Sequence, residues 1–115
     1  MVITLRTVGD VLVFDIEGVY TREAPPNPTL KELVKAKLEK PVKKILFNLE
    51  KAEIESDVGV ADIISSYVSI LEVKGTLKFA GLSSKTRRLF RVICLDKIFD
   101  IYLSEKDALE SFART

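Results

Sequence analysis

The segment IESDVGVADII, residues 54–64, places two small oxygen-bearing side chains, Ser56 and Asp57, between an apolar run and a helical pattern. A serine hydroxyl can accept a phosphoryl group, and an aspartate can carry a fixed negative charge. Asp57 also fits the N-cap position, where its carboxylate would accept a backbone N–H and meet the positive end of the helix dipole. We therefore predict that Asp57 caps the helix that follows, and we ask whether the same residues also carry a regulatory charge.

The composition excludes most catalytic chemistry. The sequence contains no histidine and one cysteine, so a transition-metal site and a Ser-His or Cys-His nucleophile are not expected. GLSSKT at residues 81–86 lacks the Gly-Lys core and the spacing of a P-loop. An aspartyl-phosphate site at Asp57 would need Mg²⁺ held by clustered carboxylates, and no acid pair ends an earlier strand. We predict that the protein is not an enzyme and has no metal and no cofactor.

The overall composition is that of a globular domain, with 47% hydrophobic residues, 30% charged residues and a net charge of +1. The length predicts one domain, residues 1–115. Interspersed charges give no broad field for nucleic acid or an anionic membrane. Cys94 lies in the apolar run VICL and is predicted to be a buried hydrophobe in a reducing compartment. No apolar stretch is long enough to span a membrane. We expect a cytoplasmic protein that binds neither nucleic acid nor membrane.

Apolar periodicity and turn residues predict nine elements. From the third strand on, strands and helices alternate, which favours parallel pairing through right-handed crossovers. The first two strands read as a hairpin about Gly9-Asp10, and Pro41 ends the first helix. The fold class is predicted as α/β, with a mixed, mainly parallel sheet of about five strands, about four helices and an N-terminal hairpin. Strands are expected at residues 2–7, 11–18, 43–49, 76–81 and 98–103, and helices at residues 29–38, 57–73, 83–93 and 104–112.

The helix predicted at residues 57–73 has two faces at about 100° per residue. The apolar half is predicted to pack on the sheet. Its members are Val60, Ala61, Ile63, Ile64, Tyr67, Val68, Ile70 and Leu71. The opposite half nearly lacks the long charged side chains of a solvated helix, so it is either a docking face for another protein or merely a small-residue surface. Its members are Val58, Asp62, Ser65, Ser66, Ser69, Glu72 and Val73.

The order of elements, with ILFNLEKAEIESDVGVADII and LSSKTRRLFRVICLDKIFDIYLSEKDAL, resembles the STAS domain of bacterial anti-sigma-factor antagonists over nearly the whole chain. The middle motif of that family is an apolar strand ending Asp-Leu, followed by Asp-Ser-Ser-Gly-Leu at a helix start. Asn48-Leu49 corresponds to the first pair, and Ser56-Asp57-Val58-Gly59-Val60 to the second. The resemblance implies that an unmodified antagonist binds the anti-sigma factor and frees the sigma factor, and that phosphorylation of the first motif serine ends this binding.

Carried over by position, Asp57 occupies the phosphoacceptor position and Ser56 that of the family's aspartate. A phosphoserine brings about −1.5 to −2 charges and three acceptor oxygens, whereas an aspartate brings one charge and two oxygens. Asp57 would then be a partial imitation of the phosphorylated state. Our hypothesis is that the protein cannot be switched by phosphorylation here and has one fixed binding preference. Phosphorylation of Ser56 remains an alternative.

The resemblance therefore implies a non-enzymatic interaction regulator that binds a kinase-like anti-sigma factor or another STAS or signalling protein. It is expected to be a monomer or a weak dimer. The alternative is a STAS scaffold subunit of a larger signalling assembly that serine phosphorylation does not regulate. Gly59 in the first helical turn is expected to leave the backbone open to close approach. The predicted partner-binding residues are Ser56, Asp57, Val58, Gly59, Asp62, Ser65, Ser66 and Ser69.

Overall fold

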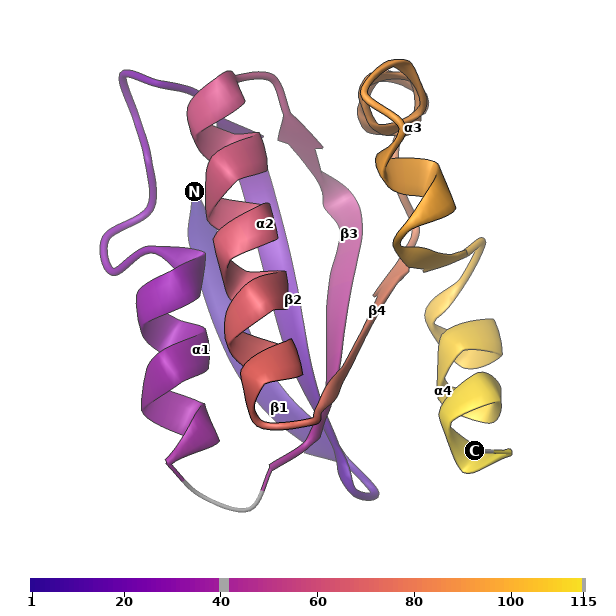
Figure 1. The fold of residues 1–115 in the computed structure, drawn as a ribbon. Helices are drawn as coiled ribbons and strands as arrows, with labels where there is room; N and C mark the ends of the chain where they lie inside the picture. Colours follow the sequence, from indigo (N-terminus) through magenta and orange to yellow (C-terminus); the bar gives the residue numbers. More distant parts are fainter. Residues whose placement is uncertain (40–41, 115) are drawn as a thin grey trace.

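The computed structural model describes residues 1–39 and 42–114, and this part of the chain forms the five strands and four helices that the sequence predicts (Figure 1). The prediction that Pro41 ends the first helix lies outside the described residues. The strands are β1 Val2–Val8, β2 Val11–Tyr20, β3 Lys44–Ile54, β4 Thr76–Ala80 and β5 Asp100–Tyr102. The helices are α1 Leu30–Leu38, α2 Asp57–Glu72, α3 Ser84–Val92 and α4 Glu105–Ala113, with a 3-10 turn at Leu95–Lys97.

The strands form one sheet in the order β1-β2-β3-β4-β5. β1 and β2 are antiparallel and every later neighbour is parallel, which confirms the predicted hairpin and mainly parallel sheet. β2 and β3 both continue beyond their predicted ends, because they pair again after a register shift between Asp15 and Glu17. The extension ends with the Glu55 N–H donating to the Tyr20 carbonyl at 3.2 Å. It brings the start of α2 beside the end of β2.

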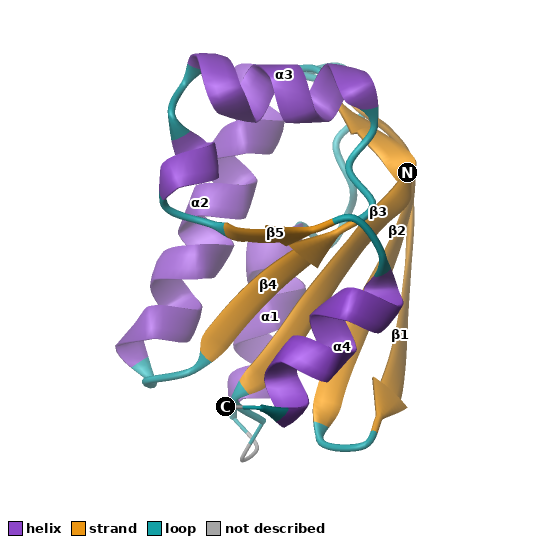
Figure 2. Ribbon diagram, turned by 90° about the vertical axis from the view of Figure 1, so that its right-hand side faces the viewer, coloured by secondary structure: helices purple, strands orange, loops and turns teal. Residues whose placement is uncertain are grey.

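Helices cover both faces of the sheet. α1, α2 and α3 pack on one face and α4 on the other (Figures 1 and 2). The sheet has a hydrophobic core on each face, and successive side chains of β3 point into one or the other. Phe47 belongs to the larger core, and Leu46 belongs to the smaller core under α4. Rings dominate the larger core, where Phe79 stacks on Phe99 at 4.6 Å between centroids. Burial of these apolar side chains is the main favourable term in folding. No helix in the described part of the chain is long and apolar enough to cross a bilayer.

The turn after α3 departs from the prediction. Cys94 is exposed and has a φ of 63°, in the left-handed region that few non-glycine residues adopt. The predicted burial of its thiol is wrong, because the helix ends at Val92 and the chain turns outward before Leu95 returns to the core. Ser83 caps α3 and Ser104 caps α4 through the Asp107 N–H.

Candidate functional site

Ser56, one residue before Asp57, is the N-cap of α2. Its backbone is extended and its Oγ accepts a hydrogen bond from the Gly59 N–H at 3.0 Å. The same hydroxyl donates to the Tyr20 carbonyl at 3.4 Å. The prediction that Asp57 caps the helix is therefore wrong, since the serine already satisfies the first-turn donor that a cap serves. The hydroxyl of Ser56 is also engaged in both contacts, so a phosphoryl group placed there would break the cap.

Asp57 is the first residue of α2 and points outward. Its side chain is 77% exposed, and the Arg22 Nη2 lies 2.6 Å from each of its two carboxylate oxygens. The Val58 N–H donates to Asp57 Oδ1 at 3.0 Å. An exposed ion pair of this kind contributes little to stability, typically below about 1 kcal/mol. The pair therefore holds the carboxylate in place without burying it.

Arg22 is the site residue that sequence reasoning missed. It lies in the loop after β2, 35 residues before Asp57. β2 and β3 are parallel neighbours, so the segments that follow them leave the sheet at the same end. Only that pairing brings Arg22 to Asp57, and no local pattern in the sequence indicates it.

Asp62 is buried and anchors the start of α1. Its Oδ2 accepts from the Tyr20 hydroxyl at 2.6 Å and from the Leu30 N–H at 2.9 Å, and its Oδ1 accepts from the Lys31 N–H at 2.9 Å. The two N–H groups are first-turn donors that lack partners within their own helix. Burial raises the pKa of the Tyr20 hydroxyl above its ordinary value, and the hydrogen bond to Asp62 adds to the shift. One carboxylate thus joins β2, α1 and α2.

The small-residue face of α2 is turned inward. Asp62, Ser66, Ser69 and Gly59 are all buried. Ser66 and Ser69 donate their hydroxyls to carbonyls one turn earlier in the helix. A Cβ on Gly59 would lie 3.0 Å from the side chains of Ile54 and Tyr20. These four predicted partner-binding residues are buried, so the prediction that they are exposed is wrong, because small side chains let α2 pack closely on the elements beside it.

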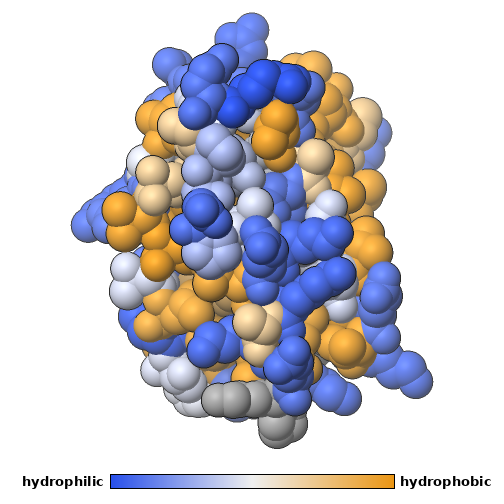
Figure 3. Space-filling view, turned by 90° about the vertical axis from the view of Figure 1, so that its left-hand side faces the viewer, coloured by the Kyte–Doolittle hydropathy of each residue, from blue (hydrophilic) through white to orange (hydrophobic). Residues whose placement is uncertain are grey.

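The outward face of α2 is apolar instead. Ile64, Val68 and Leu71 are 39%, 45% and 49% exposed, and Ala61 is exposed as well, although all four were predicted to pack on the sheet. Asp57 lies at the start of this outward face, because residues three or four positions apart lie on one side of a helix. In the view from the α1 side, polar residues predominate over the middle and apolar surface gathers along the margins (Figure 3).

The accessible surface at the start of α2 therefore combines one carboxylate with small and apolar side chains. Of the predicted partner-binding residues, Asp57 is exposed, and Ser56, Val58 and Ser65 are half-buried. Their assignment to a partner stays a prediction. We call the accessible part of this region the Asp57 surface. It consists of Asp57, Val58, Ala61, Ile64 and Ser65.

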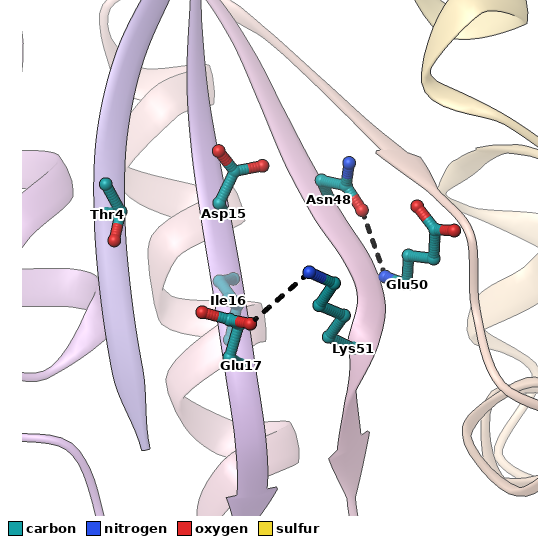
Figure 4. A pocket seen from close by; sticks show the side chains of 7 residues that line it. All are labelled: Thr4, Asp15, Ile16, Glu17, Asn48, Glu50 and Lys51. Atoms are coloured by element: carbon teal, nitrogen blue, oxygen red, sulfur yellow. Dashed lines mark hydrogen bonds and ion pairs between the residues drawn. The ribbon is translucent and has the colours of Figure 1, made fainter.

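A concave region lies on the other face of the sheet, beside the start of α4 (Figure 4). It has a volume of about 320 Å³. Its cations are held in ion pairs, since Lys51 pairs with Glu17 and Arg6 pairs with Asp15 and with Glu105. No group of three or more potential metal ligands occurs among the described residues. The lining residues of the hollow are Thr4, Asp15, Ile16, Glu17, Asn48, Glu50 and Lys51.

Solved structures with a similar fold include anti-sigma factor antagonists. The unphosphorylated form of SpoIIAA, a Bacillus cell fate determinant, matches with a TM-score of 0.80 at 17% identity over 99% of this chain and 98% of that one. An anti-sigma factor antagonist from Mycobacterium paratuberculosis matches with a TM-score of 0.80 at 22% identity over 96% and 92%. A third is RsbS from Moorella thermoacetica, in a serine-to-glutamate variant, with a TM-score of 0.77 at 14% identity over 96% of each chain.

These likenesses establish the fold. No curated protein matches the chain in sequence. The model of one family, the STAS domain, matches residues 3–108. The segment that it matches contains every strand pairing from β2 to β5, the cap of α2 and the whole Asp57 surface. The chain therefore belongs to the STAS domain family.

Proposed function

We propose that this protein is a non-enzymatic regulator of the anti-sigma-factor antagonist type, and that a kinase-like anti-sigma factor or a related signalling protein docks on the Asp57 surface. One observation carries the proposal. The carboxylate of Asp57 stands at the first residue of α2 and is 77% exposed, and the motif resemblance assigns this position to the family's phosphoacceptor serine. A charged group at a docking site affects the affinity for a partner through its charge complementarity.

The Arg22 contact supports a fixed rather than a switchable charge. Arg22 holds both oxygens of Asp57, as a guanidinium would hold a phosphoryl group. The pair leaves less net negative charge than a phosphoserine would bring. The Ser56 hydroxyl caps α2, so the neighbouring serine does not supply a free acceptor in this state. The binding preference of the protein is therefore set by its sequence and not by a kinase.

The docking site is tested by adding a bulky charge to it. Titration calorimetry compares the wild type with Ala61→Arg, which alters an exposed residue of the Asp57 surface, against the kinase-like anti-sigma factors of the same genome. Ala113→Arg is the matched control, because Ala113 is also an exposed helical alanine and lies at the far end of α4. We expect the wild type and Ala113→Arg to bind one of these proteins equally, and Ala61→Arg to bind it at least about tenfold more weakly, a difference of about 1.4 kcal/mol.

Two results would overturn the proposal. One is a wild type that binds none of these anti-sigma factors. The other is an Ala61→Arg variant with wild-type affinity for the factor that does bind, since the partner would then dock elsewhere.

A further inference from the structure

The exposed apolar residues of α2 have the spacing of a coiled-coil seam. Ala61, Ile64, Val68 and Leu71 follow one another at intervals of three, four and three residues, the a and d positions of a heptad. They are exposed along the whole outer side of the helix. The positions that flank them carry no block of like charges, since Val60, Ser65 and Tyr67 are uncharged and only Glu72 is acidic. We call these four residues the α2 seam.

We propose that the α2 seam pairs with the α2 seam of a second copy of this chain, with the two helices antiparallel about a two-fold axis. Such an interface must be self-complementary. With the axis beside residue 66, Ala61 faces the partner's Leu71 and Ile64 faces the partner's Val68. A small side chain then packs against a large one at both ends of the seam, and two β-branched side chains pack against each other on each side of its centre. The side-chain volumes are therefore matched in this register.

The charges at the two ends of α2 also favour the antiparallel orientation. The ion pair of Asp57 with Arg22 lies at the start of the helix, and the exposed residues Glu72 and Lys74 lie at its end. Antiparallel pairing brings Asp57 toward the partner's Lys74 and Arg22 toward the partner's Glu72. Parallel pairing would place Asp57 against the partner's Asp57, and like charges oppose association. Charge complementarity thus favours a second copy in one orientation.

One helix seam is smaller than the standard interface, which buries about 800 Å² per partner. The dimer is therefore weak and reversible. It covers Ala61 and Ile64, which also belong to the Asp57 surface, so a second copy and a docked partner exclude each other. This regulatory consequence rests on the proposed function, whereas the self-association does not.

Sedimentation of the isolated chain over a concentration series tests the pairing. The mass of the wild type is expected to rise from one chain toward two. Val68→Asp places a charge in the seam and should raise the dissociation constant at least tenfold. Val92→Asp is the matched control, because Val92 is a 72% exposed valine on α3, and it should behave as the wild type. A wild type that stays monomeric at every concentration overturns the proposal, as does a dimer that Val68→Asp leaves intact.

Disulfide trapping tests the orientation. In a Cys94→Ser background, the double variant Ala61→Cys/Leu71→Cys is oxidised and its mass compared with that of Ala61→Cys alone. The two new thiols are ten residues apart, about 15 Å along one helix, so they cannot bridge within a chain. Covalent dimers from the double variant but not from the single variant support antiparallel pairing, and covalent dimers from Ala61→Cys alone contradict it. No anti-sigma factor takes part in either experiment, so failure here leaves the proposed function to its own test.

Discussion

Asp57 and Asp62 both lie on α2, yet their surroundings give them opposite roles. Asp57 is exposed and has one charged partner, Arg22. Asp62 is buried and accepts three hydrogen bonds from β2 and α1. A buried donor that loses its acceptor costs the full desolvation of that group, whereas an exposed pair exchanges its partner for water. The first aspartate is therefore available for binding, and the second stabilises the fold.

This contrast predicts different effects on stability. Asp62→Ala leaves the Tyr20 hydroxyl and the Leu30 and Lys31 N–H groups without an acceptor, and should lower the free energy of unfolding by about 3 kcal/mol or more. Asp57→Ala should lower it by less than about 1 kcal/mol. Urea denaturation of both variants measures the difference. Equal losses, or a larger loss for Asp57→Ala, would show that these roles are misassigned.

Tyr20 predicts how stability depends on pH. The fold raises the pKa of its hydroxyl above the ordinary value of 10.0, so the folded state holds this proton more tightly than the unfolded state. The corresponding stability is complete below pH 10 and is lost as the pH rises further, because the unfolded chain then releases the proton first.

The matched variant is Tyr20→Phe, which keeps the aromatic ring at position 20 but lacks its hydroxyl. The other two tyrosines that the comparison must control for, Tyr67 and Tyr102, are present in both proteins. Its free energy of unfolding should fall less steeply than that of the wild type between about pH 10 and about pH 11. Denaturation at a series of pH values provides the comparison. Parallel pH profiles for the two proteins would argue that the Tyr20 hydroxyl ionises equally easily in the folded and unfolded states.

At the scale of the element, the bounds of α2 follow from the sequence but its orientation does not. The helix was predicted at residues 57–73 and runs from Asp57 to Glu72. Periodicity placed the apolar side toward the sheet, but α2 has more apolar residues than one buried face accommodates. The buried side includes Asp62 and Ser66, whose polar groups are satisfied by β2, α1 or the helix itself. Partners of that kind are tertiary contacts that a helical wheel does not contain.

The orientation of α2 is tested by introducing a leucine on each side of the helix. Ser66→Leu adds a large side chain where none of the residue is exposed, and should destabilise the protein by about 1–3 kcal/mol through overpacking. Ala61→Leu adds it on the outer side and should change stability by no more than about 0.5 kcal/mol. Thermal unfolding of both variants measures this. The opposite order would restore the orientation that periodicity predicted.

At the scale of the whole molecule, the parallel pairing of β2 and β3 builds the site. Ligand sites of open α/β sheets lie at the carboxyl ends of the strands, and here that end holds Arg22, Ser56 and Asp57. The alternation of elements in the sequence was enough to predict the sheet, and the small polar pair after β3 was enough to predict where α2 begins. The Arg22 contact depends on strand register and loop path, which no local pattern encodes. The predicted cap failed by one residue, because Ser56 and Asp57 are both good cap residues and only geometry chooses between them.

The most direct test of the central claim restores a hydroxyl to the acceptor position. Asp57→Ser, the wild type and Asp107→Ser are incubated with ATP and the kinase-like anti-sigma factor that binds the wild type, and phosphorylation and affinity are measured. Asp107 is the control because it is an exposed acid in the first turn of another serine-capped helix. We predict that only Asp57→Ser is phosphorylated, and that its affinity then changes at least about tenfold. An Asp57→Ser protein that gains no phosphoryl group and binds as the wild type does would contradict the account.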